Sequence, residues 1–192
     1  MFDVDMRLRP SGSKGPVASQ FRGFVAYHDQ EAELWEHMAL TRARPLAGDP
    51  GLSREVQEAI TGLLARPRDR RRVFREVAAM RQVIEREKGE GDGWDLKIAP
   101  GGLIDLDFLA QALVLAHASE RPDLVGLPTP AVFPAASMSG HLDPADAATL
   151  ADGFRRRAWR SRAAGAPRRG ARTGQADLPF GAARAVSAYS GS

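Results

Sequence analysis

Residues 2–9 alternate between apolar and charged side chains, which is the period of a half-buried β-strand. The apolar positions are Phe2, Val4, Met6 and Leu8, and the charged positions are Asp3, Asp5, Arg7 and Arg9. Pro10 cannot donate a hydrogen bond to a neighbouring strand, so the strand is expected to end there. The polar stretch 11–16 contains glycine, serine and proline, and it predicts a tight loop after the strand.

Apolar residues at helical spacing follow, and they predict a mainly helical body. The expected helices cover 17–29, 30–44, 53–65, 69–88, 103–118 and 143–154. Ser53 is the expected N-cap of the third helix, and Asp143 followed by Pro144 is a typical helix start. The segment 103–118 is apolar nearly all round, which places it in the middle of the body.

Three further segments have no helical pattern. Residues 94–98 alternate and predict a short extended segment. Residues 121–140 are interrupted by prolines and show no convincing periodicity. From Arg155 onward the chain is rich in Arg, Ala and Gly without an apolar face, which predicts a disordered or weakly structured tail.

Length and composition limit the class of protein. A chain of 192 residues suits one domain with a real core. It contains no cysteine, which excludes disulfides and thiolate metal sites. No apolar run reaches membrane-spanning length, and Met1 leads directly into the strand-like pattern without signal-peptide features. We therefore expect a soluble, cytoplasmic protein without a membrane partner.

The positive net charge of +3 is concentrated in the tail, because nine of the 27 basic residues but only one of the 24 acidic residues follow position 154. A basic tail of this kind binds RNA or an acidic partner in some proteins. The alternative is a segment translated in the wrong reading frame. The abrupt loss of acidic residues and of periodicity at one point favours the second interpretation, so we do not expect nucleic acid as a partner.

The predicted strand and loop bring together groups that suit phosphate chemistry. The strand carboxylates Asp3 and Asp5 are acids that could bind a metal, and Arg7, Arg9 and Lys14 are candidate phosphate-binding residues. A solvated polar face on an edge strand, with internal ion pairs, is the other interpretation of these charges.

Charged residues in the helical body are candidates for supporting roles. Glu36 lies near Arg42 and Arg44 in the predicted helix 30–44, where it could orient the arginines of the strand. Asp105 and Asp107 lie in the first turn of the predicted helix 103–118, where the helix dipole favours carboxylates in any protein.

Three stretches carry a resemblance to a known family. They read VDMRLRPSGSKGP at 4–16, WEHMALTRAR at 35–44 and WDLKIAPGGLIDLDF at 94–108. In residue identity, order and spacing these stretches resemble the glutamine synthetase adenylyltransferase family, and more closely its C-terminal, adenylyl-adding half. The resemblance covers roughly residues 1–120.

The resemblance implies a fold and a site. The family's catalytic domain is similar to the polymerase-β superfamily, in which three carboxylates hold two divalent metals at the phosphates of ATP. Asp5 matches the third carboxylate, whereas the Gly-Ser…Asp-x-Asp motif that supplies the other two does not precede it. The implied organisation is therefore the end of an α/β nucleotidyltransferase domain at 1–16, a helical domain at 17–154 and the tail at 155–192.

The implied function is transfer of AMP from ATP to a tyrosine of glutamine synthetase, with Mg²⁺ or Mn²⁺, in the regulation of nitrogen assimilation. With one of the three carboxylates, this chain alone is expected to be inactive. Glutamine synthetase and a PII-type signalling protein are the implied partners. Two alternatives stay open: a non-catalytic helical module that binds glutamine synthetase or a signalling protein, and a nucleic-acid-binding protein that acts through the tail.

Overall fold

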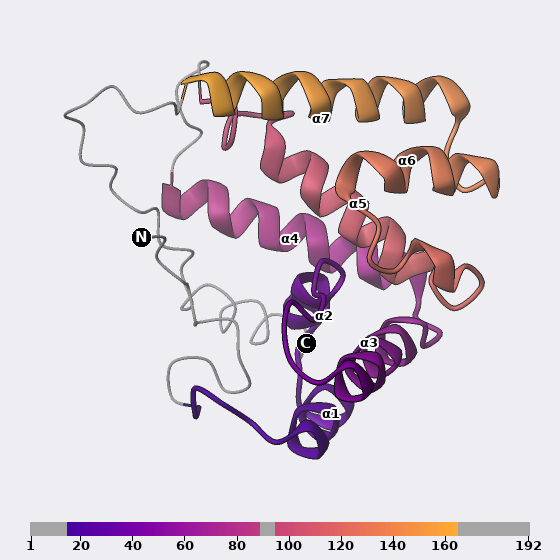
Figure 1. Cartoon of the computed structure of the whole chain (residues 1–192). Helices are drawn as coiled ribbons and strands as arrows, with labels where there is room; N and C mark the ends of the chain where they lie inside the picture. The colour runs from indigo at the N-terminus through magenta and orange to yellow at the C-terminus, as the bar shows by residue number, and fades with distance from the viewer. Residues whose placement is uncertain (1–14, 89–94, 165–192) are drawn as a thin grey trace.

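The computed structural model describes residues 15–88 and 95–164, and within these ranges the chain is helical (Figure 1). It forms α1 (Phe21–Gln30), α2 (Leu34–Leu40), α3 (Pro50–Leu64), α4 (Arg70–Lys88), α5 (Leu103–His117), the 3-10 helix η2 (Pro122–Leu124), α6 (Thr129–Met138) and α7 (Pro144–Ala164). The mainly α part of the predicted fold class is confirmed. No strand and no α/β nucleotidyltransferase domain occurs in the described ranges, and the strand predicted at 2–9 lies outside them.

Helix α5 is the centre of the body, as its apolar composition predicted. It packs against α2, α4, α6, α7 and η2. One cluster of buried residues joins α5 to η2, α6 and α7, and it includes Leu113, Val114 and the fully buried Phe133. The other cluster joins α5 to α2, α3 and α4, and it includes Leu115 and Leu64. Figure 1 shows α5 passing between α4 and the α6–α7 pair, so that both clusters share this helix.

Helix α3 begins four residues earlier than the sequence indicated. Its N-cap is Asp49, whose carboxylate accepts a hydrogen bond from the backbone N–H of Leu52 at 2.9 Å, and Pro50 occupies the first helical position. The prediction of Ser53 as the cap was therefore wrong. Pro50 fits the first turn because the N–H that it lacks has no partner inside a helix there.

The predicted extended segment at 94–98 is wrong over the residues that the structure describes, because residues 96–98 form a turn. The carboxylate of Asp95 accepts hydrogen bonds from the backbone N–H groups of Lys97, at 2.9 Å, and Ile98, at 3.1 Å. The chain then passes so close to itself that a Cβ added at Gly102 would lie 2.6 Å from the carbonyl oxygen of Ala99. Gly102 is thus required for the entry into α5.

Two helices extend beyond the predicted pattern. Helix α6 lies within 121–140 and contains Pro134, yet it forms because Val132, Phe133 and Ala136 are buried in the core. Helix α7 continues through Ala164, so the prediction that helical structure ends at Phe154 was wrong. Asp152 pairs with Arg155 and Arg156 one turn later, and such pairs stabilise an exposed helix. Residues 165–192 of the predicted tail lie outside the described ranges.

None of the described helices combines the length and the apolar character needed to cross a membrane.

Candidate functional site

The carboxylate of Asp107 connects three helices. It lies on α5, where its Oδ1 accepts a hydrogen bond from the hydroxyl of Thr129 at the start of α6, over 2.6 Å. Its Oδ2 accepts a hydrogen bond from Nη1 of Arg42, just after α2, over 3.1 Å. The structure therefore brings together Arg42 and Asp107, two of the residues predicted to support the site. Thr129 completes the group and was not predicted.

Asp105, two residues earlier, has a different set of partners. Its carboxylate pairs with the guanidinium of Arg81 on α4 and accepts a hydrogen bond from the backbone N–H of Gly101 over 2.6 Å. Arg81 also donates to the carbonyl oxygen of Ile98 over 2.8 Å. Asp105 thus holds α4 and the turn at 95–102 against the first turn of α5. Arg81 lies on a helix rich in charged residues, but its side chain is only 14% exposed.

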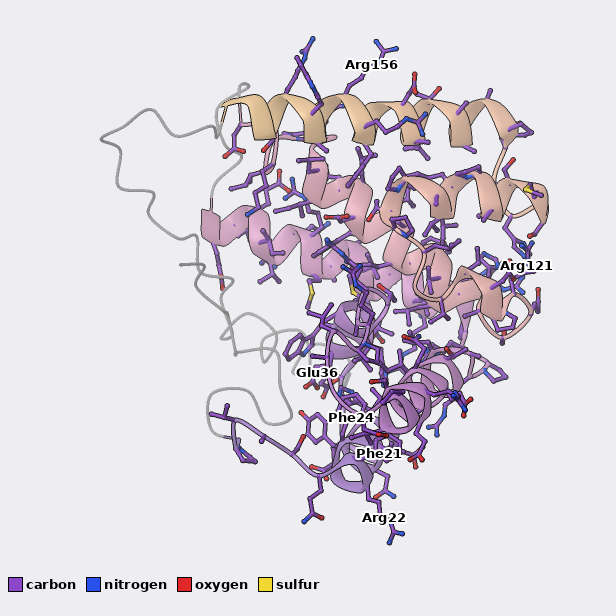
Figure 2. The ribbon with its side chains drawn as sticks, in the orientation of Figure 1. Phe21, Arg22, Phe24, Glu36, Arg121 and Arg156 are labelled. Carbon is purple, nitrogen blue, oxygen red and sulfur yellow. The ribbon has the colours of Figure 1, made fainter. Side chains whose placement is uncertain are left out.

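Glu36 is buried at the start of α2, and both of its carboxylate oxygens have partners in the helical body. One carboxylate oxygen accepts a hydrogen bond from the Tyr27 hydroxyl over 2.8 Å, and the other accepts one from the backbone N–H of Glu33 over 2.9 Å. In the reciprocal bond the backbone N–H of Glu36 donates to the Glu33 side chain, and the two bonds form a capping box. Figure 2 shows Glu36 above Phe24 of α1, in the region where α1 and α2 meet.

Arg44 is exposed and has no ion pair with any residue in 15–88 or 95–164. The candidate metal ligand Asp5 and the candidate phosphate-binding residues Arg7, Arg9 and Lys14 lie outside the described residues. Their roles stay predictions.

Two histidines meet between α1 and α2. His28 is buried, its ring packs edge-on against Phe24 and Tyr27, and its carbonyl oxygen lies 2.9 Å from Nε2 of His37. Burial, assisted by the neighbouring His37, lowers the pKa of His28 to about 4. Burial also lowers the pKa of His37, although its hydrogen bond to the His28 carbonyl opposes that shift. Both rings are therefore held in the neutral form near pH 7.

A second pair of histidines, together with an acid, meets at the C-terminal end of α5. His117 is the last residue of α5, Glu120 follows in the next turn, and His141 lies between α6 and α7. The two imidazole rings stack with centroids 3.8 Å apart, and Nε2 of His141 lies 3.9 Å from a carboxylate oxygen of Glu120. Burial, with the nearby His141, lowers the pKa of His117 to about 4. Sequence reasoning missed this group, because its members come from separate elements.

The described residues do not suit the magnesium site of a nucleotidyltransferase. Mg²⁺ binds carboxylate and water oxygens, and such a site needs several acids that converge. In residues 15–88 and 95–164, the group that could hold a metal contains two histidines and one acid. Asp105 and Asp107 are each bound to arginine on separate sides of α5. A magnesium site would therefore depend on Asp5 and on further acids outside the described residues.

Comparison with known proteins agrees with the resemblance read from the motifs. The sequence profile of the family described as glutamate-ammonia ligase adenylyltransferase matches residues 1–59. A bifunctional glutamine synthetase adenylyltransferase/adenylyl-removing enzyme from Xanthobacter autotrophicus is 49% identical over 150 residues, which is 78% of this chain. Proteins with the same description from Rhodopseudomonas palustris (strain TIE-1) and Bradyrhizobium sp. (strain BTAi1) are 49% and 47% identical over the same length.

The matched region is a small part of each of those proteins. The chain spans about 15% of the length of the curated relatives that it matches, and each match covers 78% of this chain. The identity of 47–49% over 150 residues and the motifs at 4–16, 35–44 and 94–108 lead to the same assignment. The chain therefore belongs to the glutamate-ammonia ligase adenylyltransferase family.

Proposed function

We propose that this chain is part of an enzyme that transfers AMP from ATP to a tyrosine of glutamine synthetase, and that its described helices form the body that supports the catalytic strand. The observation that carries the proposal is the 49% identity over 150 residues to enzymes described as having adenylyl-adding and adenylyl-removing activities. Of the two activities, we propose addition, because the motif RLRPSG at 7–12 resembles the adenylyl-adding half of the family.

In this proposal the strand at 2–9 contributes the chemistry. Asp5 is a ligand of Mg²⁺ or Mn²⁺, and Arg7, Arg9 and Lys14 neutralise the phosphates of ATP. The tyrosyl oxygen attacks the α-phosphorus in line and pyrophosphate leaves, so charge accumulates on the phosphate oxygens that these cations face. The divalent metal supplies charge neutralisation at the phosphates when it is bound.

In this proposal the helices form the support for the catalytic segment, and contacts between them fix their arrangement. Arg42, Asp107 and Thr129 fix the end of α2 and the start of α6 to α5, and Asp105 fixes α4 to the same helix. Glu36 fixes the start of α2 against Tyr27 of α1. We propose that these residues hold the helices in place, because the side chain of each forms hydrogen bonds or ion pairs with other groups of the protein. Arg44 is exposed and unpaired among described residues, so it is the one of the set that is free to reach a phosphate or a partner protein.

A second candidate is a non-catalytic helical module that binds glutamine synthetase or a PII-type signalling protein. The observation that favours it is the absence, in the described ranges, of converging carboxylates that could hold magnesium. The enzyme requires Asp5 as a metal ligand, whereas the non-catalytic module does not.

The test is a chimaera in which this chain replaces the matching segment of the Xanthobacter autotrophicus relative. Label from α-labelled ATP is followed into glutamine synthetase, and loss of label from adenylylated glutamine synthetase is followed in parallel. We expect transfer, and we expect Asp5→Asn to lower its rate about a hundredfold, equivalent to about 3 kcal/mol of transition-state stabilisation. Asp3→Asn, on the same predicted strand face, is the matched control and should be nearly silent.

The outcomes separate the candidates. If Asp5→Asn and Asp3→Asn are equally harmless in a folded, active chimaera, Asp5 is not a metal ligand and the catalytic proposal fails. If the isolated chain also binds glutamine synthetase in a pull-down, that result favours the module. Label removed rather than added, with Asp5→Asn slowing the removal, would assign the chain to the de-adenylylating activity instead.

A further inference from the structure

The group His117, Glu120 and His141 has the composition and spacing of a transition-metal site. One ligand atom from each residue, a ring nitrogen or a carboxylate oxygen, lies within 4.8 Å of the others. Two imidazoles and one carboxylate are the donors that Zn²⁺ uses in three-residue sites, where water takes the fourth position. Metal–ligand bonds of about 2.0–2.2 Å place such donors about 3–4 Å apart, so small side-chain movements would complete the geometry.

The backbone on both sides of this group is fixed by helix caps. At the end of α6, Gly140 adopts φ +73° and its N–H donates to the carbonyl of Ser137, while the N–H of His141 donates to the carbonyl of Ala136. This is a Schellman cap, and it fixes the place of His141. At the end of α5, the N–H groups of Glu120 and Arg121 both donate to the carbonyl of His117. The three residues are therefore presented from two rigid turns.

His117 has a buried ring nitrogen that forms no hydrogen bond with the described residues. The residue is 6% exposed, and its Nδ1 is buried without a hydrogen-bond partner among the described residues. A buried polar atom without a partner is costly, so a ligand that engages the ring would remove a penalty. Because the pKa of His117 is lowered to about 4, its imidazole is neutral near pH 7 and keeps a lone pair for a metal.

The other two residues have freedom to adjust. The rings of His117 and His141 lie 15° from parallel, so their lone pairs converge on one ion only if a ring rotates. His141 is the more exposed of the two, with 17% of its side chain accessible. Glu120 is 57% exposed and pairs with Arg70, which is 45% exposed. A surface pair of this kind is weak, so the carboxylate can turn from Arg70 towards a metal.

We propose that His117, Glu120 and His141 bind a divalent transition-metal ion of the Zn²⁺ class, which links the end of α5 to the turn between α6 and α7. This site is separate from the magnesium chemistry proposed for Asp5, both in donor type and in residues. It does not depend on the proposed function. Imidazole nitrogen favours Zn²⁺ over Mg²⁺, and the chain has no cysteine that would compete for the ion.

The test measures Zn²⁺ binding by the full chain after treatment with a chelator, using isothermal titration calorimetry, with Co²⁺ absorption as a second probe. We expect one bound ion per chain and a higher thermal midpoint in its presence. His141→Gln and Glu120→Gln should each weaken Zn²⁺ binding about tenfold or more. Both positions are more exposed than His117, and circular dichroism checks that each variant is folded.

The matched control uses the other histidine pair. The chain has four histidines in all, and His28 and His37 form the other pair, between α1 and α2. His37→Gln should bind Zn²⁺ as tightly as the parent chain. If the parent chain binds no Zn²⁺, if either His141→Gln or Glu120→Gln binds as tightly as the parent, or if His37→Gln weakens binding equally, the proposal is wrong.

Discussion

Arg42 and Asp107 are 65 positions apart in the sequence, and the guanidinium of the first donates to the carboxylate of the second over 3.1 Å. The two ends of this contact differ in environment, because the Arg42 side chain is 57% exposed and that of Asp107 is 21% exposed. Asp107 also accepts the hydroxyl hydrogen bond of the buried Thr129. The contact therefore joins a surface cation to an acid that has a structural role of its own.

The first prediction concerns this asymmetry. Asp107→Ala should lower the free energy of unfolding by about 1–3 kcal/mol, because it leaves the buried Thr129 hydroxyl without its partner. Arg42→Ala should cost less than about 1 kcal/mol, because exposed ion pairs contribute little. Urea titration of both variants measures the difference. Equal losses would mean that the ion pair, and not the bond to Thr129, gives Asp107 its importance.

The second prediction concerns the central helix. Leu113 on α5 is 3% exposed and lies in the cluster shared with α6 and α7. Leu113→Ala should lower the free energy of unfolding by about 2–5 kcal/mol, since it removes buried apolar surface and leaves a cavity. Leu46→Ala is the control, because Leu46 is 83% exposed and should change stability little. A small effect of Leu113→Ala in urea would show that α5 is not the centre of the core.

Part of this architecture could be predicted from the sequence. Helix α5 was found because its apolar residues surround the helix, which indicates burial whatever the neighbours are. Helix α6 was missed because Pro134 interrupts its pattern, and the burial of Phe133 outweighs that local cost. The end of α7 was missed because its last turns have no apolar face, and the pairs of Asp152 with Arg155 and Arg156 were not predicted from the sequence.

The candidate site could also be predicted only in part from the sequence. The charges at Asp105 and Asp107 could be found from the sequence, but their partners could not. Arg81 reaches Asp105 only because α4 packs against α5, and nothing in its sequence neighbourhood marks it as the partner of Asp105. Glu36 was expected to orient the arginines of the strand, whereas one of its oxygens caps α2 and the other accepts a hydrogen bond from the Tyr27 hydroxyl. Pairings made by the crossing of helices depend on tertiary packing, which periodicity does not encode.

The third prediction compares two glycines. A Cβ at Gly102 would lie 2.6 Å from the backbone oxygen of Ala99 and 2.9 Å from that of Lys97, so the turn before α5 would have to shift. Gly102→Ala should destabilise the chain by about 1–3 kcal/mol. Gly62, inside α3, has nothing within 4 Å of the same position. Gly62→Ala should stabilise the chain by about 0.5–1 kcal/mol, because alanine favours the helix. Opposite signs in urea titrations would verify the close approach at Gly102, and equal signs would contradict it.

The last prediction concerns acid stability and His28. The pKa of His28 in the folded chain is lowered to about 4, whereas an unfolded histidine has a pKa of about 6.5. Between these values the unfolded state binds more protons than the folded state, so this residue's contribution to stability is complete above about pH 6.5 and is lost as the pH falls towards about 4. The buried ring, packed against Phe24, Tyr27 and His37, is the physical cause.

The measurement is the free energy of unfolding of the parent chain and of His28→Gln at a series of pH values. Glutamine does not titrate, so the difference between the two proteins should shrink as the pH is lowered from about 7 to about 4.5. Gly62→Ala is the control, because it changes stability without adding or removing an ionisable group, and its difference from the parent should stay constant with pH. His117 shares the lowered pKa but remains in all three proteins, so its contribution cancels in each difference. A difference for His28→Gln that does not vary with pH would mean that His28 takes up its proton equally in the folded and unfolded chains, and that the space between α1 and α2 is open to water.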